Sequence, residues 1–221
     1  MLKAVLFDMD GVIVDTEPLH HKAYFGMFNN LKIEVSEAHY QTFTGQSTIN
    51  VCKSLCSHFK LHNNPEELVQ IKRQIFKDLF KNDPNLQLID GVLDLIKDYH
   101  ENGLTLVLAS SASMGTIESV FNRFDLDQYF LAKLSGADLK ASKPHPEIFV
   151  KAAEVSGYNK KNCLVIEDST NGIKAANAAN IFCVGYKSAH SKNQDYSKAN
   201  FIINDFKEIE YKRVKLFFNH F

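Results

Sequence analysis

The sequence predicts an α/β protein with a doubly wound, Rossmann-like parallel sheet and an inserted small all-helical domain. Short runs rich in Val, Ile, Leu and Phe recur along the chain, as in strands that are buried on both faces. From about residue 90 onward these runs alternate with helical segments. Between residues 17 and 80, by contrast, the apolar residues recur at helical spacing. The two patterns together predict a sheet with a helical insertion.

The strands are expected over residues 3–7, 104–109, 162–166, 181–184 and 201–203, and helices over 92–101, 114–124, 146–156 and 171–179. Gly103 and Gly157 follow two of these helices, where glycine commonly ends a helix. In parallel sheets of this type, ligands bind beyond the carboxyl ends of the strands. Candidate functional residues are therefore expected directly after each apolar run.

The helical insertion is marked by three apolar faces, which consist of Tyr24, Phe25 and Phe28, of Val51 and Leu55, and of Leu68, Ile71, Ile75 and Leu79. One strand precedes the insertion and the rest of the sheet follows it, so the helices must form a separate lobe. We therefore predict a catalytic core of residues 1–14 and 87–221 and a helical cap of residues 15–86.

The charge of the chain excludes some partners. A formal net charge of −1 in 221 residues favours neither a nucleic-acid groove nor an anionic membrane surface, so we expect a small-molecule partner. The first apolar run is interrupted by Asp8 and Asp10, too early for a signal peptide or a membrane span. The protein is expected in the cytoplasm.

Cys52 and Cys56, with His58 and His62 after them, offer the residue types of a zinc site. The spacing of four residues also places two small apolar side chains on one buried helix face, and we favour that interpretation.

Two carboxylates separated by one residue, Asp8 and Asp10, follow the first predicted strand and precede Gly11. At a strand end such a pair can hold a cation or act as nucleophile and acid/base. An Asp-x-Asp-Gly turn that merely ends the strand is the structural alternative. The motif needs partners elsewhere in the chain to carry a function.

Candidate phosphate-binding residues follow later in the chain. Ser110 and Ser111 come after a predicted strand and just before a helix, where a hydroxyl and free amides suit a phosphate, while one of the serines, such as Ser113, caps the helix. Lys143 lies in a loop that prolines stiffen, which can aim its ammonium, although a loop lysine is more often solvated.

Glu167 and Asp168 are adjacent acids at a further strand end. Two adjacent acids are costly without a cation or donors nearby, and capping of the next helix needs only Ser169 or Thr170. Nucleophilic carboxylates, hydroxyl, lysine and acids all follow apolar strands, in the order that one active site requires.

The segment from Asp8 to Asp15, with Ser110, Lys143 and Glu167-Asp168, resembles the four motifs of the haloacid dehalogenase superfamily over almost the whole chain. The insertion after the first motif resembles the small helical cap of the branch that contains β-phosphoglucomutase and hexose-phosphate phosphatases. The resemblance implies a Mg²⁺-dependent phosphatase that acts on small phosphomonoesters, foremost sugar phosphates, through an aspartyl-phosphate.

The same resemblance implies residue roles. Asp8 is the nucleophile and Asp10 the general acid/base, and the phosphoryl group is bound by Ser110, Ser111 and Lys143. The implied Mg²⁺ ligands are Asp8, the backbone carbonyl of Asp10, Asp168 and, as an open alternative, Glu167. The implied substrate-binding residues of the cap and its entry are Thr16, His20, Gly45, Gln46 and Thr48.

One departure from the family pattern concerns the outcome of the reaction. The segment from Thr44 to Thr48 resembles the substrate loop of β-phosphoglucomutase, which carries basic residues where Thr44 and Thr48 stand. Without these charges a bisphosphate intermediate is harder to hold, which favours hydrolysis. Lys53, Lys72 or Lys77 could substitute, so a phosphosugar mutase is the alternative prediction.

Three other classes fit less well. A signalling receiver domain also takes phosphate onto an Asp, but it has no helical insertion after its first acids. A dehalogenase needs neither Asp10 nor Asp168. A binding module that has lost catalysis would not need the full set of reactive side chains that this chain retains.

Overall fold

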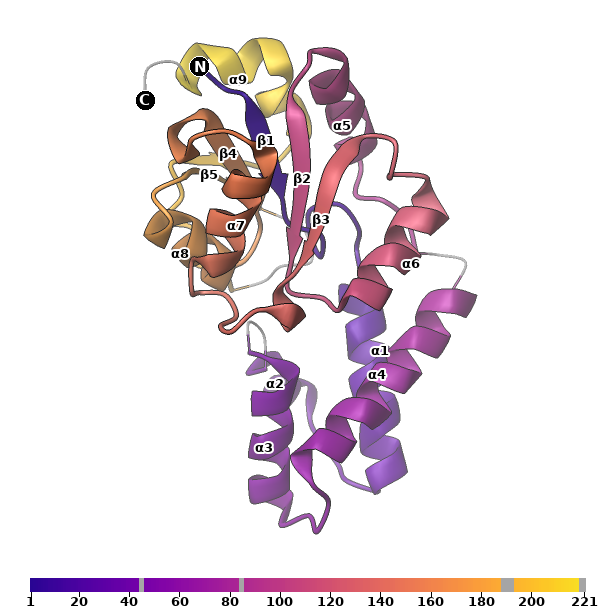
Figure 1. Ribbon diagram of the computed structural model, residues 1–221. Helices are drawn as coiled ribbons and strands as arrows, with labels where there is room; N and C mark the ends of the chain where they lie inside the picture. The colour runs from indigo at the N-terminus through magenta and orange to yellow at the C-terminus, as the bar shows by residue number, and fades with distance from the viewer. Residues whose placement is uncertain (44–45, 84–85, 188–192, 219–221) are drawn as a thin grey trace. The chain divides into compact units, whose positions relative to one another are not determined.

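A computed structural model describes residues 1–43, 46–83, 86–187 and 193–218 (Figure 1). The chain forms two compact units. The sheet unit comprises Met1–Asp15 and Gln87–Phe221, and the helical unit comprises Thr16–Leu86. Each unit has its own hydrophobic core. In the described part of the chain, no helix combines the length and the apolar composition that crossing a membrane requires.

The sheet unit is built on a parallel sheet whose strands, over the described residues, are β1 (Ala4–Phe7), β2 (Thr105–Ser110), β3 (Phe130–Ser135), β4 (Cys163–Glu167), β5 (Phe182–Tyr186) and β6 (Phe201–Ile203). Their order is β3-β2-β1-β4-β5-β6, and every neighbouring pair is parallel. This is the strand order of Rossmann-type folds, with the change of direction beside β1. The predicted fold class is confirmed.

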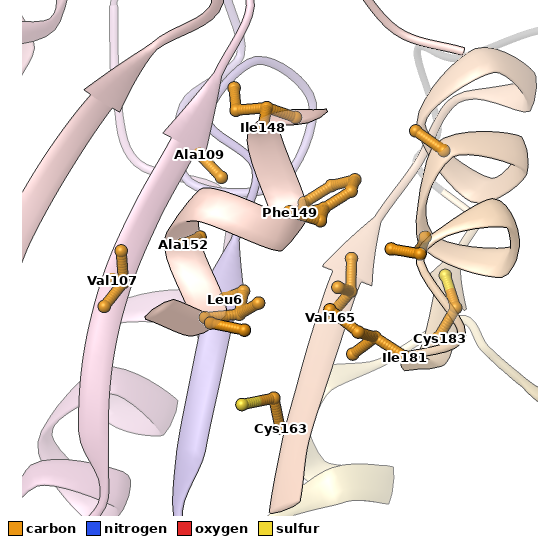
Figure 2. Packing of buried hydrophobic residues seen from close by; sticks show 14 of the residues in the cluster. Leu6, Val107, Ala109, Ile148, Phe149, Ala152, Cys163, Val165, Ile181 and Cys183 are labelled. Atoms are coloured by element: carbon orange, nitrogen blue, oxygen red, sulfur yellow. The ribbon is translucent and has the colours of Figure 1, made fainter. Parts of the chain in front are cut away.

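Helices cover both faces of the sheet. They are α5 (Val92–Glu101), α6 (Met114–Phe124), α7 (Glu147–Ser156), α8 (Thr170–Ala178) and α9 (Tyr211–Phe218). On one face Phe149 and Ala152 of α7 pack with Leu6, Val107 and Val165 of the strands, as Figure 2 shows. Burial of this apolar surface is the main force that holds α7 on the sheet.

The opposite face is covered by α5. Successive strand residues point to opposite faces, so Phe7, next to Leu6, contacts Tyr99 of α5 with ring centroids 6.3 Å apart. Tyr99 is fully buried, and its hydroxyl donates to the Ile209 carbonyl at 2.5 Å. This bond ties α5 to the segment that leads into α9.

The helical unit contains α1 (Glu17–Leu31), α2 (Glu37–Gln41), α3 (Thr48–Phe59) and α4 (Pro65–Asn82). Residues from each of the three predicted apolar faces are buried together in its core, including Tyr24, Val51 and Leu68. The start of α4 is fixed by a capping box, in which Asn64 and Glu67 each satisfy backbone donors that the helix leaves open.

Element boundaries agree with the sequence prediction to within two residues, and helices 92–101 and 114–124 and strand 201–203 match fully. Among the strands and α-helices of the described residues, β3, α2 and α9 were not predicted. The first is an edge strand whose side chains are mostly half-buried or exposed, so it lacks the continuous apolar run of the central strands. The helix α2 is only five residues long.

Candidate active site

Three neighbouring strands deliver acidic and hydroxyl side chains to one edge of the sheet. Asp8 follows β1, Ser110 is the last residue of β2, and Glu167 is the last residue of β4. These strands are adjacent in the order β2-β1-β4. Because parallel strands end at the same edge, their carboxyl ends bring these residues together. All three are buried, with Ser110 at 0% exposure.

Lys143 is the cation of this cluster. Its Nζ lies 2.5 Å from Asp8 Oδ1 and 2.7 Å from Glu167 Oε1, and its side chain is 6% exposed. Burial acts to lower the pKa of Lys143, but the carboxylates of Asp8 and Glu167 outweigh burial and hold the pKa above its ordinary value. The ammonium therefore stays charged.

The side chain of Lys143 contacts α7, the helix that follows its loop. Lys143 Nζ lies 4.8 Å from the ring centroid of Phe149, which is fully buried in the first turns of α7. A cation over an aromatic face is attracted to it.

The backbone after Lys143 leads directly into α7, and the Lys143-Pro144 peptide bond is cis. Of the predicted helix 146–156, Pro146 is the N-cap residue and α7 begins at Glu147.

The two acids after β4 are bound differently. Glu167 Oε2 accepts hydrogen bonds from the Ser169 backbone N–H at 2.8 Å and the Ser169 hydroxyl at 2.9 Å, while Oε1 contacts Lys143. Asp168 lies against Gly11, where an added Cβ would meet Asp168 Oδ2 at 2.0 Å. Gly11 has φ +81°, so both its backbone conformation and its contact with Asp168 require glycine.

Glycine is also required at the start of α8. A Cβ on Gly172 would lie 1.6 Å from Glu167 Oε1, inside the carboxylate. The Gly172 backbone N–H donates to the Ser169 hydroxyl, which caps α8. Because Gly172 has no Cβ, the start of α8 can approach the Glu167 carboxylate closely.

One oxygen from each of the carboxylates of Asp8, Glu167 and Asp168 lies within 4.8 Å of the others, so the three residues are close enough together to share a metal ion. Burial raises the pKa of Asp8 to about 7; Lys143 acts in the opposite direction, and Glu167 and Asp10 add to the rise. Burial, together with these neighbouring carboxylates, thus disfavours the charged form of Asp8 by more than Lys143 offsets. An all-oxygen, buried and acidic cluster suits a hard divalent cation.

Asp10 lies in a tight turn after Asp8. The turn is closed by hydrogen bonds from Ile13 N–H to the Met9 carbonyl at 2.8 Å and from Gly11 N–H to the Val14 carbonyl at 2.9 Å. Asp10 is half-buried and close enough to raise the pKa of Asp8.

The serines at the end of β2 and just after it have different surroundings. Ser110 Oγ accepts from the Ala112 N–H at 3.0 Å, whereas Ser111 is exposed. Ser113 is the N-cap residue of α6, but among the described residues its hydroxyl pairs with the Thr116 hydroxyl at 3.1 Å instead of capping the helix backbone. Ser113 therefore occupies the predicted N-cap position, although its hydroxyl bonds another side chain and not the helix backbone.

In the helical unit, Thr16 and His20 lie at the start of α1. Thr16 is buried and is the N-cap residue. His20 Nδ1 lies 2.6 Å from Lys72 Nζ, and the His20 ring stacks on Phe76 at 4.4 Å. Burial and then the charge of Lys72 lower the pKa of His20 well below its ordinary value, so the imidazole is neutral and accepts from the ammonium.

The predicted substrate loop is described in part. Gly45 and Thr44 lie outside the described residues. Gln46 is exposed, and its Nε2 donates to the Thr42 carbonyl at 2.8 Å. Thr48 is the first residue of α3 and its side chain hydrogen-bonds Tyr24. Of the lysines considered as substitutes, Lys72 is buried, while the other two, Lys53 and Lys77, are exposed.

Sequence reasoning did not identify several residues that contact this cluster. Phe149 looks like any core residue of a helix, and Ser169 was seen only as a helix cap. Tyr196, whose hydroxyl donates to the Asp168 carbonyl at 2.9 Å, lies in a loop with no recognisable motif. For Gly11 and Gly172, the signal was their position directly beside the acidic motifs.

A family model described as haloacid dehalogenase-like hydrolase matches residues 5–186, and the chain belongs to this family. Hexitol phosphatase B from Escherichia coli (strain K12) is 29% identical over 190 residues, which cover 86% of each chain. The phosphorylated carbohydrates phosphatase of Thermotoga maritima is 29% identical over 196 residues, which cover 87% of this chain and 88% of the relative.

Solved structures with the same fold include β-phosphoglucomutase from Clostridium difficile. It superposes with a TM-score of 0.82 at 25% identity and covers 100% of this chain and 98% of its own. The predicted superfamily is confirmed by the family match. The predicted enzyme class, phosphoric monoester hydrolase, agrees with the family and with the phosphatase names of its relatives.

Proposed function

We propose that the protein is a Mg²⁺-dependent phosphatase of small phosphomonoesters, foremost sugar or sugar-alcohol phosphates, with Asp8 as nucleophile. The observation that carries this proposal is the buried cluster in which the Asp8 carboxylate lies 2.5 Å from Lys143 Nζ and has oxygens of Glu167 and Asp168 within 4.8 Å. A phosphate dianion repels a carboxylate, so the attack needs positive charge on the phosphoryl oxygens.

Asp8, Asp168 and the backbone carbonyl of Asp10 would hold Mg²⁺. Burial and then the carboxylates of Glu167 and Asp10 disfavour the charge on Asp8, and a divalent cation would stabilise that charge. Glu167 has Lys143 on one oxygen and Ser169 on the other, which favours a role in holding the lysine and the turn rather than direct coordination. Bound Mg²⁺ would supply charge neutralisation at the phosphoryl group.

The residues of the sheet unit then divide the reaction. Lys143 and Ser110 bind phosphoryl oxygens, and Asp8 attacks phosphorus, so that a bond from Asp8 to phosphorus forms as the ester bond breaks. Asp10 gives its proton to the leaving alcohol oxygen. In the second half Asp10 takes a proton from water, whose oxygen attacks phosphorus, and phosphate leaves Asp8 as the free carboxylate.

The substrate class is supported by the relatives. The printed names of two of them refer to hexitols and to phosphorylated carbohydrates. We assign the choice among such substrates to the helical unit, through Thr16, His20, Gly45, Gln46 and Thr48. Lys72, beside His20, adds a positive charge to this unit.

A phosphosugar mutase is the second candidate, and two observations favour it. The chain is 25% identical to a solved β-phosphoglucomutase across its whole length. Lys72 is a buried cation of the helical unit, and a mutase needs positive charge for a second phosphate. Against it, Thr48 offers a hydroxyl that is already engaged by Tyr24 and carries no charge. Hydrolysis remains the favoured outcome.

The test is a screen of phosphorylated hexoses, pentoses and hexitols with Mg²⁺, in which released phosphate and isomerised sugar phosphate are both measured. β-Glucose 1-phosphate with a trace of the 1,6-bisphosphate is included to reveal mutase activity. Asp8→Asn is the control, since an amide of the same shape cannot attack phosphorus. We expect released phosphate to dominate. Glucose 6-phosphate formed many times faster than phosphate would replace this function by the mutase.

A further inference from the structure

The loop after β5 reaches back to the turn that carries Asp168. Three hydrogen bonds connect the two segments. The Tyr196 hydroxyl donates to the Asp168 carbonyl at 2.9 Å, the Thr170 N–H donates to Gln194 Oε1 at 2.8 Å, and the Asp195 N–H donates to the Thr170 hydroxyl at 2.7 Å. Residues 194–196 of this loop thus hydrogen-bond the turn between β4 and α8.

The Tyr196 hydroxyl bonds a backbone carbonyl in the segment that joins strand to helix. Asp168 lies between the end of β4 at Glu167 and the start of α8 at Thr170, and it is 5% exposed. A buried carbonyl at such a position needs a donor, and the bond also fixes the orientation of its peptide plane. The direction of the Asp168 side chain depends on that orientation.

The position of the Tyr196 ring is set by the neighbouring strand. A Cβ on Gly185 of β5 would lie 2.9 Å from Tyr196 Cδ1, so the ring lies directly against the backbone of this strand. On the other side, Asp168 Oδ2 would be 2.0 Å from a Cβ on Gly11. The Asp168 carboxylate thus lies directly against the Gly11 backbone, while the ring whose hydroxyl bonds the Asp168 carbonyl lies against the Gly185 backbone.

We propose that Tyr196 is a positioning residue for metal binding. Its hydroxyl holds the Asp168 backbone so that the carboxylate points at the same site as Asp8. The inference rests on the proposed function, which assigns Asp168 to Mg²⁺. Groups that hydrogen-bond metal ligands from outside the coordination sphere commonly change metal affinity by about 10- to 100-fold.

The experiment is a calorimetric titration of the protein with Mg²⁺ alone, for the unmodified chain and for Tyr196→Phe. Phenylalanine keeps the ring against Gly185 and removes the donor to Asp168. We expect Mg²⁺ to bind about tenfold more weakly to the variant. Tyr158→Phe is the matched control, since Tyr158 is 39% exposed and lies just after α7. The control is expected to bind Mg²⁺ as the unmodified protein does.

A second readout separates positioning from general damage. In Tyr196→Phe the Mg²⁺ concentration for half-maximal activity should rise, while kcat at saturating Mg²⁺ and the melting temperature without metal stay close to the unmodified values. A fall in both kcat and melting temperature, with unchanged Mg²⁺ affinity, would overturn the inference.

Gln194→Leu is a second variant, which frees the Thr170 N–H and leaves Tyr196 in place. It should weaken Mg²⁺ binding in the same direction and by a smaller factor. Unchanged Mg²⁺ affinity in both variants, with normal binding by the unmodified protein, contradicts the role of Tyr196 and leaves the proposed function intact. If the unmodified protein binds no Mg²⁺, the metal assignment of the proposed function itself fails.

Discussion

Lys143 in the sheet unit and Lys72 in the helical unit are both buried cations, but their surroundings differ. Lys143 contacts the carboxylates of Asp8 and Glu167. Lys72 Nζ lies 2.6 Å from His20 Nδ1, 5.1 Å from the Tyr24 ring centroid and 4.9 Å from that of Phe76. One lysine stabilises acids that are candidates for chemistry, and the other lies beside a neutral imidazole and aromatic faces.

The difference follows from the two architectures. Adjacent parallel strands end at one edge and place their following residues together, so charged groups from distant parts of the sequence meet there. In the helical unit, the candidate residues Thr16, Gln46 and Thr48 each lie at a helix end or in a loop, and Gln46 and Thr48 have local hydrogen-bond partners. We therefore expect substitutions in the sheet unit to abolish turnover and substitutions in the helical unit to redirect it.

The largest effect is expected from Lys143→Met. The substitution leaves Asp8 and Glu167 without the ammonium between them and removes a positive charge from the phosphoryl site. We expect kcat/KM to fall by about 10² to 10³. Breaking a buried ion pair by removing one partner also costs about 3–5 kcal/mol of folding free energy, less where Asp8 takes up a proton.

Steady-state kinetics and chemical denaturation measure these two effects. The matched control is Lys140→Met in the same loop, because Lys140 is exposed. A Lys143→Met variant as active as the control would remove the lysine from the phosphoryl site.

The two acids after β4 should differ in their effect on the metal. Asp168→Ala removes a proposed ligand, whereas Glu167→Ala removes an acid that already binds Lys143 and Ser169. We expect the Mg²⁺ concentration for half-maximal activity to rise about 100-fold in the first and distinctly less in the second. Activity should vanish in excess chelator and return with Mg²⁺. The reverse ranking of the two variants would make Glu167 the more important ligand.

Thr48→Arg should change the product of the reaction rather than its rate. A guanidinium there can bind a second phosphate bidentately and hold a bisphosphate long enough for transfer. We expect a several-fold rise in the ratio of isomerised sugar phosphate to free phosphate. The substitution also removes the hydrogen bond with Tyr24, at a cost of about 1 kcal/mol.

Thr48→Val is the matched control for this prediction, since it loses the same hydrogen bond without adding a charge. Its product ratio should stay at that of the unmodified protein. A ratio that changes equally in both variants would show that the charge is not responsible.

The smallest effect is expected from the pH dependence of stability at His20. Because the folded-state pKa of His20 is lowered, the unfolded chain takes up the proton first as the pH falls below about 6.5. The contribution of this residue is fully present above that pH and is lost towards acid, by at most about 1.4 kcal/mol per pH unit.

His20→Gln keeps an acceptor for Lys72 and removes the titration. Urea denaturation at pH 7.5 and pH 5.5 should therefore show a larger loss of stability in the unmodified protein than in the variant. Equal losses of stability in the two proteins would mean that His20 takes up its proton as readily in the folded protein as in the unfolded chain.

The central features were predictable from sequence because they follow from local patterns. Buried strands appear as apolar runs, and Asp8, Ser110 and Glu167 stand directly after them. The edge strand β3 was not predicted because its side chains are only partly buried. The contact of Lys143 with Phe149 joins a loop to a helix, and that of Asp168 with Tyr196 joins residues 28 positions apart; no spacing rule relates such partners.

The proposed covalent intermediate on Asp8 can be measured directly. The protein is mixed with Mg²⁺ and its best substrate, quenched, and reduced with borohydride, which converts an aspartyl-phosphate to homoserine. Peptide mass spectrometry then locates the change. We predict homoserine at position 8, only when substrate is present, and a loss of turnover by several orders of magnitude in Asp8→Asn. Rapid phosphate release with no modification at position 8 and substantial activity in Asp8→Asn would contradict the mechanism.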